Sequence, residues 1–394
     1  MSSNDPVVIV SAKRTPMGSF LGGLCLAQVT DLGATAIKAA IACAGIKANE
    51  VDEVLMGCVL PAGAGQAPAR QAGLKAGLAD CVGATTVNKV CGSGIKTLMQ
   101  AHDAINAESI EVAIAGGMES MSNAPYLLAK AREGYRMGHG ELKDHMMFDG
   151  LEDAYQAMPM GALAQITADK QQVSREAMDA FAIHSAKKAC YAAETGAFLN
   201  EIEPVVIRTR KGDICIRRDE GPELVNPDKI PKLKPVFAKS GTITAANASS
   251  ISDGAAALVL MKASKAEANH LTPLCRIVAH ASHAQAAEDF TLAPIGAINA
   301  LLEKAGWQKE EVDLWEINEA FAMVTMLAVN ELGLDNEKVN VNGGACALGH
   351  PLGASGARIV VTLIHALKNR GLSKGVAALC IGGGEAVAIA VEVP

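Results

Sequence analysis

An excess of positive charge is missing from this sequence. Its 35 Lys and Arg residues are outnumbered by 42 Asp and Glu residues, which leaves a formal net charge of −7. This balance argues against a protein that holds nucleic acid by bulk electrostatics or binds a membrane through a polybasic face, although it leaves room for a local basic patch. We therefore expect neither nucleic acid nor a membrane among its partners.

Paired cysteine motifs and long apolar runs are also missing. The ten cysteines are scattered, with no CxxC pair and no Cys/His cluster at zinc spacing, so we expect neither disulfides nor a metal. The polar segment Met1–Asp5 shows no export signal, and no uninterrupted apolar run reaches the roughly 18 residues of a spanning helix. The pattern predicts a soluble protein of a reducing compartment, most simply the cytoplasm.

Aromatic residues make up only 3% of the chain, whereas half of it is hydrophobic and 38 residues are glycine. Small apolar side chains suit the close packing of helices on a parallel sheet, which predicts an α/β fold. The length of 394 residues exceeds one ordinary domain and fits two or three.

Similarities between the two ends of the chain indicate a duplication. Three short matches recur 254 to 266 residues apart, in the same order along the chain. They pair Ala44–Asp52 with Ala305–Asp313, Val87-Asn88 with Val341-Asn342, and Ala115–Gly117 with Ile381–Gly383. Each match alone is weak, but together they predict two similar α/β halves.

Strand-like and helical segments alternate within each half, which favours parallel pairing with right-handed crossovers. The segment from about 123 to 242 differs, because it is richer in charge, Met and His and contains one strong helix from Ser174 to Gly196. We interpret it as an inserted loop domain. The predicted division is an N-terminal α/β half over 1–122 and 243–271, the loop domain over 123–242, and a C-terminal α/β half over 272–394.

Cys91 lies between a strand-like segment, Ala84–Val87, and apolar residues at helical spacing. Those residues are Ile95, Leu98, Met99, His102 and Ile105. At such an elbow the helix N-terminus and free backbone N–H groups would favour a thiolate and could hold an oxyanion. Glycines 92 and 94 would let a substrate approach the backbone. For this segment alone, a small buried cysteine is the more common outcome.

Two Gly-rich segments of the second half carry further candidates. His350 stands between Gly349 and Pro351, before a helix that we expect to start near Ser355. Its neutral imidazole could take a proton from a thiol, and a structural histidine is the alternative. Cys380 ends a predicted strand before three glycines, where the N–H of Gly382 could stabilise developing negative charge.

Asn318 ends the predicted strand Val312–Ile317, where it could orient a water or a carbonyl, although a helix cap is its more common role. Neither GxGxxG nor a Walker lysine is present, which argues against a nucleotide-binding fold. Open α/β sheets bind ligands at strand ends. A cysteine activated by a histidine, with a second cysteine for proton transfer, indicates acyl-thioester chemistry, and the set could also serve carbon–carbon bond formation next to a thioester.

From Val8 to the Cys380 segment, the sequence resembles the thiolase family. The resemblance is carried by Gly65–Gln71, Asn88–Gly94, Ala115–Ser122, Asn247–Ser249, Asp253–Ala256, Asn318–Ala322 and Gly344–Gly356. It implies the five-layered α-β-α-β-α thiolase fold, usually a dimer of dimers, so we expect a homotetramer. The implied activity is that of an acyltransferase: a reversible, ping-pong Claisen condensation of two acetyl-CoA to acetoacetyl-CoA plus CoA through an acetyl-cysteine. CoA thioesters are then substrates, and no cofactor is expected.

Carried over residue by residue, the resemblance implies a set of catalytic roles. Cys91 is expected to be the nucleophile, His350 the base that activates it, and Cys380 the acid/base that moves the α-proton of the second acetyl-CoA. One oxyanion hole is implied for His350 with a water held by Asn318. The N–H groups of Cys91 and Gly382 are expected to form the other.

The resemblance also implies a substrate site. Ala248 and Ser249 match the segment that lies along the pantetheine of CoA, and Met160, Phe290 and Phe321 are expected to bind substrate.

The sequence departs from the family pattern around this pocket. Pro159 and Gln165 stand where the family has a histidine and a glutamate, Phe290 replaces a methionine, and Ala386 replaces a glycine. An arginine that commonly follows the Asp-Glu of the CoA-binding segment is absent around 219–223. These changes bear on acyl-chain preference, CoA affinity and turnover, since Phe290 would narrow the acyl pocket and Pro159 would reopen it.

Three alternatives accompany this interpretation. One is a 3-ketoacyl-CoA thiolase of broader chain length, and another is a catalytically impaired acyl-CoA binding protein. The third, a ketoacyl synthase, would pair the cysteine with two histidines, and Asn318 stands where one of these is expected.

Overall fold

Ten strands form one mixed sheet, in the order β14-β15-β16-β13-β1-β12-β5-β3-β4, with the short β2 paired to β12. The computed structural model describes residues 5–394. The strands are β1 (Val7–Arg14), β2 (Gly18–Ser19), β3 (Glu53–Gly57), β4 (Gly83–Val87), β5 (Val112–Ser120), β12 (Ser252–Lys262), β13 (Cys275–Ala284), β14 (Leu314–Ile317), β15 (Lys374–Ile381) and β16 (Glu385–Glu392). The two halves join where Val8 and Ile9 of β1 pair with Arg276 and Cys275 of β13.

Only part of this sheet is parallel. β3 pairs in parallel with β4 and β5, and β14 with β15. In contrast, β12 pairs antiparallel with β1 and β5, and β16 with β13 and β15. The expected parallel pairing is therefore confirmed for strands that are joined through helices, and it does not extend to β1, β12, β13 and β16. Gly382–Gly384 joins β15 directly to β16, and a short hairpin can connect only antiparallel strands, whereas β12 follows the long excursion after β5 rather than a short crossover.

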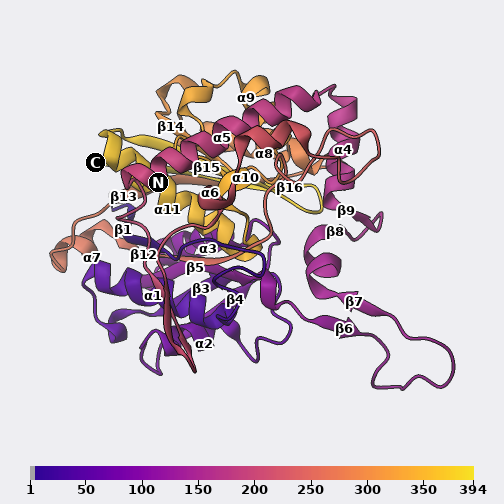
Figure 1. Cartoon of the computed structure of the whole chain (residues 1–394). Coiled ribbons are helices and arrows are strands. Elements are labelled where there is room, and N and C mark those ends of the chain that lie inside the picture. The colour runs from indigo at the N-terminus through magenta and orange to yellow at the C-terminus, as the bar shows by residue number, and fades with distance from the viewer. Residues whose placement is uncertain (1–4) are drawn as a thin grey trace.

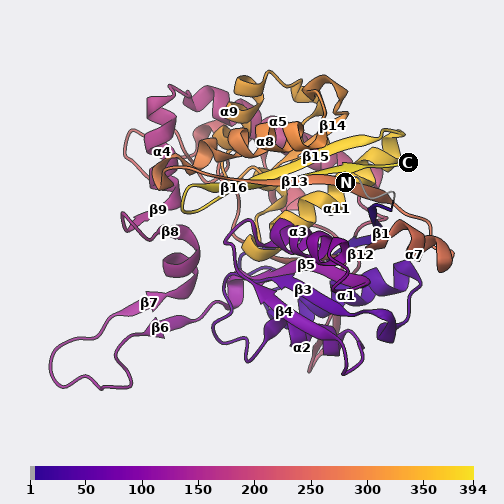
Figure 2. The same ribbon diagram turned by 180° about the vertical axis from the view of Figure 1, so that it is seen from behind.

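The strands form two groups, one in each half of the chain: β1, β12, β5, β3 and β4 in the first, and β13, β16, β15 and β14 in the second. Helices cover the outer face of each group and also lie between the two groups (Figure 1), which confirms the five-layered α-β-α-β-α fold. α3 (Ser93–Asn106) and α11 (Leu352–Arg370) lie between the two groups of strands. α1 (Val29–Ala44) and α2 (Pro68–Lys75) cover the first group, and α8 (Ala293–Ala305) and α9 (Ala322–Leu332) cover the second, as the reverse view also shows (Figure 2). Within residues 5–394, no helix is both long and apolar enough to cross a bilayer.

The central helices α3 and α11 approach each other closely at glycines. A side chain at Gly94 would clash with the backbone of Ala357, and one at Gly356 would clash with that of Ile95. Gly92 faces the side chain of Ile381 in the same way. Gly92 and Gly94 therefore serve close packing in the core, and not the approach of a substrate as the sequence suggested.

The predicted duplication is visible in matching details of the two halves. α1 and α8 both end at a left-handed glycine, Gly45 and Gly306. In the following turns Asp52 accepts hydrogen bonds from the N–H groups of Glu111 and Val112, and its counterpart Asp313 accepts them from Ser373 and Lys374. The same carboxylate thus fastens the same turn in each half.

The segment 123–242 is spread over both halves. α4 (Met160–Lys170) and α5 (Arg175–Thr195) lie beside the second half, whereas the hairpin β10–β11 (Val205–Thr209 and Gly212–Ile216) packs into the core of the first. The hairpin β6–β7 (Tyr126–Leu128 and Leu142–Asp144) extends away from the body in both views (Figures 1 and 2). The remaining short elements are β8 (Glu152–Asp153), β9 (Met158–Pro159), α6 (Gly221–Leu224), α7 (Ala263–Ala268) and α10 (Ala345–Leu348). The predicted domain boundaries stay a prediction.

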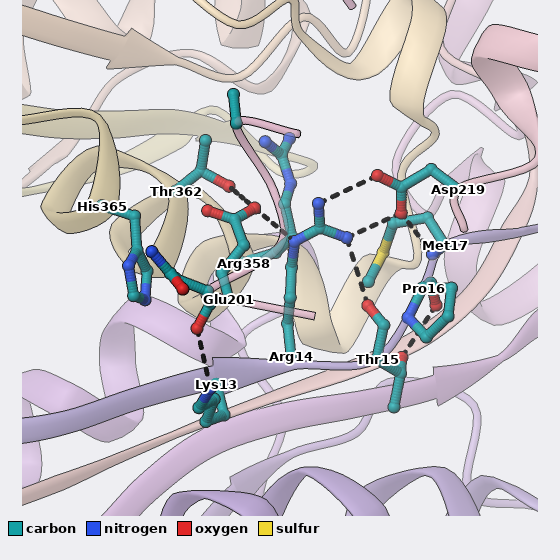
Figure 3. A network of polar contacts seen from close by, with 12 residues as sticks. Lys13, Arg14, Thr15, Pro16, Met17, Glu201, Asp219, Arg358, Thr362 and His365 are labelled. Atoms are coloured by element: carbon teal, nitrogen blue, oxygen red, sulfur yellow. Dashed lines mark hydrogen bonds and ion pairs between the residues drawn. The ribbon is translucent and has the colours of Figure 1, made fainter. Parts of the chain in front are cut away.

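A buried ionic network connects these parts (Figure 3). Arg14, at the end of β1, donates to Glu201 at 2.6 Å and to both oxygens of Asp219 at 2.6 and 2.9 Å. Thr362 of α11 donates to the same Glu201 at 3.1 Å. The first half, the 123–242 segment and the second half therefore meet at the Arg14–Glu201 pair.

Candidate active site

A cavity of about 60 Å³ lies where the two halves and the 123–242 segment meet. Eight of the ten site residues expected from the sequence line it: Cys91, Met160, Ser249, Phe290, Phe321, His350, Cys380 and Gly382. It adjoins a larger, mostly apolar cavity of about 560 Å³, whose walls include Ala248 and share Met160, Ser249 and Phe321 with the small one. Asn318 stands behind His350, with its amide nitrogen 3.5 Å from Nδ1 of the ring.

Cys91 is held in a tight turn between β4 and α3. Val90 adopts a left-handed backbone conformation with φ of 45°, which a β-branched residue rarely does. The turn is stabilised by Asn88, whose side chain accepts from the N–H of Val90 at 2.9 Å, and by Ser93, whose hydroxyl accepts from the N–H of Lys89 at 2.8 Å. The expected elbow is therefore present, and it presents the sulfur to the cavity.

The Cys91 thiol is neutral at rest. Burial raises its pKa to about 11, although the backbone N–H groups of Gly382 and Cys91 act in the opposite direction. The nearby Glu119 carboxylate raises the pKa further. The helix N-terminus alone therefore does not produce a thiolate here, and nucleophilic attack needs a base.

His350 has the geometry of that base. Its Nδ1 lies 2.5 Å from the hydroxyl oxygen of Ser355, and this hydroxyl donates its own hydrogen to the carbonyl of Pro351 at 2.8 Å. Nδ1 must therefore carry the ring proton, which leaves the lone pair on Nε2. Burial, assisted by the charge of Arg358, lowers the pKa of His350 to about 3, so the ring is neutral at ordinary pH.

Two buried polar atoms at this site have no partner among residues 5–394: Nε2 of His350 and Oδ1 of Asn318. Buried polar atoms are nearly always hydrogen-bonded, so two such atoms on neighbouring side chains indicate a place for a water or a substrate oxygen. Asn318 does not cap the following helix, because α9 begins at Ala322 after Phe321 and without a side-chain cap. The helix-cap alternative for Asn318 is wrong.

Cys380 is the next-to-last residue of β15 and is buried. Burial raises its pKa well above the ordinary range, and the neighbouring Cys91 raises it further, so this thiol is also protonated at rest. Gly382 follows in the turn to β16, whose left-handed Gly383 and Gly384 leave the N–H of Gly382 available to the cavity. The two cysteines and the histidine thus come from three separate parts of the chain: the turn before α3, the loop before α11 and the end of β15.

The substrate-binding candidates form one wall. Phe290 and Phe321 meet edge to face at 6.4 Å, and Phe321 meets Phe237 in the same way. Ala248 pairs with Phe321 in an isolated antiparallel bridge, and the N–H of Ser249 donates to Ala320 at 2.9 Å. The 248–249 segment is therefore fixed to the loop that carries Asn318.

The departures from the family pattern fall in different places. Phe290 is buried at the small cavity, whereas Pro159 lines only the larger one. Gln165 lines neither cavity: its side-chain oxygen accepts from the N–H groups of Thr242 and Ile243 at 2.9 and 3.0 Å. Ala386 pairs with Cys380 in the sheet and is completely buried.

Two residues of the site escaped the sequence analysis. Ser355, one helical turn after Pro351, sets the tautomer of His350, and its position in the motif was visible. Glu119 accepts from the N–H groups of Val59 and Gly353 at 2.9 and 2.8 Å, and burial raises its pKa to about 7. A buried carboxylate facing backbone donors has no sequence pattern of its own, so only the fold reveals it.

Comparison with known proteins agrees with this geometry. Residues 7–264 match the family model for the thiolase N-terminal domain, and residues 271–393 match that for the thiolase C-terminal domain. A relative from Escherichia coli, named acetyl-CoA acetyltransferase, is 51% identical over 98% of each chain. One of the same name from Cupriavidus necator is 50% identical over 98% of this chain and 99% of its own.

A solved structure gives the same picture. The crystal structure of the Bacillus anthracis acetyl-CoA acetyltransferase superposes with a TM-score of 0.97, at 41% identity and over 99% of both chains. The motifs, the five layers and these matches agree, and the chain belongs to the thiolase family.

Proposed function

We propose that this thiolase is an acetyl-CoA acetyltransferase, which joins two acetyl-CoA molecules reversibly into acetoacetyl-CoA and CoA. The observation that carries the proposal is the shared cavity of Cys91, His350, Cys380 and Gly382, with the unpartnered Nε2 of His350 as the available base. Relatives about half identical over nearly the full chain bear the same name.

Acylation begins with proton transfer from Cys91. The thiol gives its proton to Nε2 of His350 as the sulfur attacks the acetyl carbonyl of the first acetyl-CoA. The N–H groups of Cys91 and Gly382, which already face the sulfur, receive the carbonyl oxygen as it becomes negative. The intermediate collapses, the CoA sulfur leaves with the proton from His350, and an acetyl-cysteine remains.

Condensation then requires a carbanion. Cys380 first releases its thiol proton to water, and as a thiolate it removes an α-proton from the second acetyl-CoA, while the enolate oxygen is received by His350 with a water on Asn318. The carbanion attacks the acetyl carbon, acetoacetyl-CoA forms, and the departing Cys91 thiolate takes up the proton that Cys380 had removed. In the reverse direction Cys380 donates that proton. Its raised pKa makes the protonated form the resting one, which is the form needed for cleavage.

The size of the cavity favours a short acyl group. Only about 60 Å³ is open at the reactive residues, and the buried Phe290 ring lies against this space. Steady-state rates on acetoacetyl-CoA and on longer 3-ketoacyl-CoA thioesters test this directly. A clear preference for long chains would replace the proposal by the broader thiolase.

Separating the two half-reactions tests the assigned roles. Protein mixed with acetyl-CoA should gain one acetyl group on Cys91, detected by mass spectrometry of the peptide. Cys380→Ser should acquire the same group at a similar rate but form acetoacetyl-CoA at least a hundredfold more slowly. CoA binding without any acetyl adduct would instead support the impaired binding protein, and normal condensation by Cys380→Ser would refute its role.

We also propose a homotetramer in the cytoplasm that works without metal or redox cofactor in catalysis. The projecting β6–β7 hairpin supports assembly, because it exposes Tyr126, Tyr135, Met137 and Leu142 to solvent in the single chain. All ten cysteines are free thiols, which suits a reducing compartment. Sedimentation of the wild type and of a variant with polar residues at Tyr126 and Met137 tests the assembly, since loss of the tetramer is expected only in the variant.

A further inference from the structure

Away from the active site, two histidines and a carboxylate converge between the halves of the fold. His102 and Asp103 belong to α3, and His280 belongs to β13, 177 positions from Asp103. Oδ1 of Asp103 lies 2.9 Å from Nε2 of His280 and 3.3 Å from Nδ1 of His102. The two rings stand edge to face at 5.0 Å. A sequence motif could not reveal this group, because its members are brought together only by the fold.

We propose that His102, Asp103 and His280 bind a divalent transition-metal ion that ties α3 to β13. The three donor atoms all lie within 4.8 Å of one another. Zinc with nitrogen and oxygen ligands at about 2.0–2.2 Å places neighbouring ligand atoms roughly 3.3–3.5 Å apart in a tetrahedral site. The two separations from Asp103, 2.9 and 3.3 Å, are close to this value, and the distance between the two ring nitrogens is at most 4.8 Å.

The chemistry of the ligand atoms and their exposure to solvent determine which ions the site can bind. Two imidazoles and one carboxylate favour Zn²⁺, Co²⁺, Ni²⁺ or Cu²⁺ over Mg²⁺ and Ca²⁺, which prefer oxygen ligands. The histidine side chains are 16% exposed and the aspartate 62%, so water can complete the coordination and an ion can enter from solvent. The site is distinct from Cys91, which precedes the opposite, N-terminal end of α3.

The positive charge of Lys262 lies nearby and limits the affinity of the site for a metal ion. Nζ of Lys262 donates a hydrogen bond to Oδ1 of Asn106 at 2.6 Å, and the amide nitrogen of Asn106 lies 3.1 Å from Nε2 of His102. The charge of Lys262 opposes a bound cation, so Lys262→Gln should strengthen metal binding.

The same three residues could simply hydrogen-bond, with one carboxylate oxygen accepting from both rings. The two arrangements differ in what an ion does. A ligand that binds only the folded chain raises its melting temperature increasingly with the free ligand concentration, whereas a group that is merely hydrogen-bonded gives no such dependence on added metal.

Cobalt provides the test on the intact, untagged protein after EDTA treatment and buffer exchange. Co²⁺ bound to this site should give a visible absorption band, and Zn²⁺ should compete it away and raise the melting temperature. Both effects should be lost in His102→Gln and in His280→Gln, retained in the control His139→Gln in an exposed loop, and obtained at lower metal concentration in Lys262→Gln. Equal spectra and equal melting shifts in wild type and His280→Gln would overturn the proposal, as would no band at millimolar Co²⁺.

Discussion

The two halves of the chain build the same layers but differ in the turn that leads into the central helix. In the first half, β4 passes through the short turn at Cys91 into α3. In the second half the matching edge strand is reduced to a single bridge between Val339 and Trp315, and a longer loop containing α10 and His350 leads into α11. The duplicated scaffold brings the two helix N-termini together, and the divergent turns supply a nucleophile on one side and a base on the other.

The largest difference in activity should appear when the cysteine of each matching turn is replaced separately by alanine. Cys91→Ala should remove acyl-enzyme formation and lower turnover by at least about 10⁴-fold, because it removes the sulfur that the elbow presents to the cavity. Cys346→Ala, in the second-half loop, should retain most activity and lose about 1 kcal/mol of stability by cavity formation. Acetyl-adduct mass and acetoacetyl-CoA thiolysis measure both variants. Comparable losses of activity in the two variants would show that the two turns do not differ in their chemical role.

Removing the base should be the next largest effect. His350→Asn keeps an amide near Ser355 but lacks Nε2, and should lower kcat/KM by about 10²–10⁴-fold. It should also change the pH dependence of stability. The folded-state pKa of His350 is about 3, below the ordinary 6.5, so the unfolded chain takes up this proton first.

The wild type should therefore lose stability through this residue as the pH falls from about 6.5 towards 3. His350→Asn should show a shallower loss over the same interval in urea unfolding. An identical slope in both proteins would mean that the ring takes up its proton at the same pH in the folded and the unfolded chain.

The joint between the halves should be the next most sensitive point. Arg14→Leu leaves the Glu201 and Asp219 carboxylates buried without their partner and should cost about 3–5 kcal/mol in urea unfolding. The neighbouring Lys13→Leu is a matched control, because the ammonium of Lys13 donates to the carbonyl of Asn200 at the exposed surface. A similar loss in both variants would show that the network contributes nothing beyond a surface contact.

The smallest effect should come from the hydroxyl that orients the base. Ser355→Ala removes the partner of Nδ1, which lets the wrong tautomer form, and should lower kcat about tenfold with little change in KM. Ser355→Thr retains a hydroxyl and should recover much of the rate. If Ser355→Ala behaves as wild type, the Ser355 hydroxyl does not determine the tautomer of His350.

The sequence predicted local features well where a single residue determines them. The helix expected from Ser174 to Gly196 is α5, since Ser174 accepts from the N–H of Ala177 and Gly196 adopts the left-handed conformation that ends it. The start of α11 was placed three residues late, near Ser355. Pro351 precedes the first turn there, and Gly353 fits without a side chain against Cys58 and Glu119.

Features that depend on the whole fold could not be predicted from the local sequence. The direction of β12 and β16 depends on connections and partners far along the chain. The alternation of helices and strands therefore did not predict that these two strands run antiparallel to their neighbours. Gly94 was assigned to substrate approach because its neighbour across the helix interface, Ala357, lies in the other half. His102 was counted as one more residue at helical spacing, since its contact with His280 exists only in three dimensions.

The protonated state of Cys91 has a consequence for chemical survival. Oxidants and alkylating compounds in a cell react with ionised sulfur far faster than with the S–H form. A sulfur whose pKa is near 11 is therefore spared from such damage between turnovers. Its reactivity appears only in the moment when a thioester fills the cavity and the neighbouring ring accepts the hydrogen, so selectivity for the substrate and durability arise from the same burial.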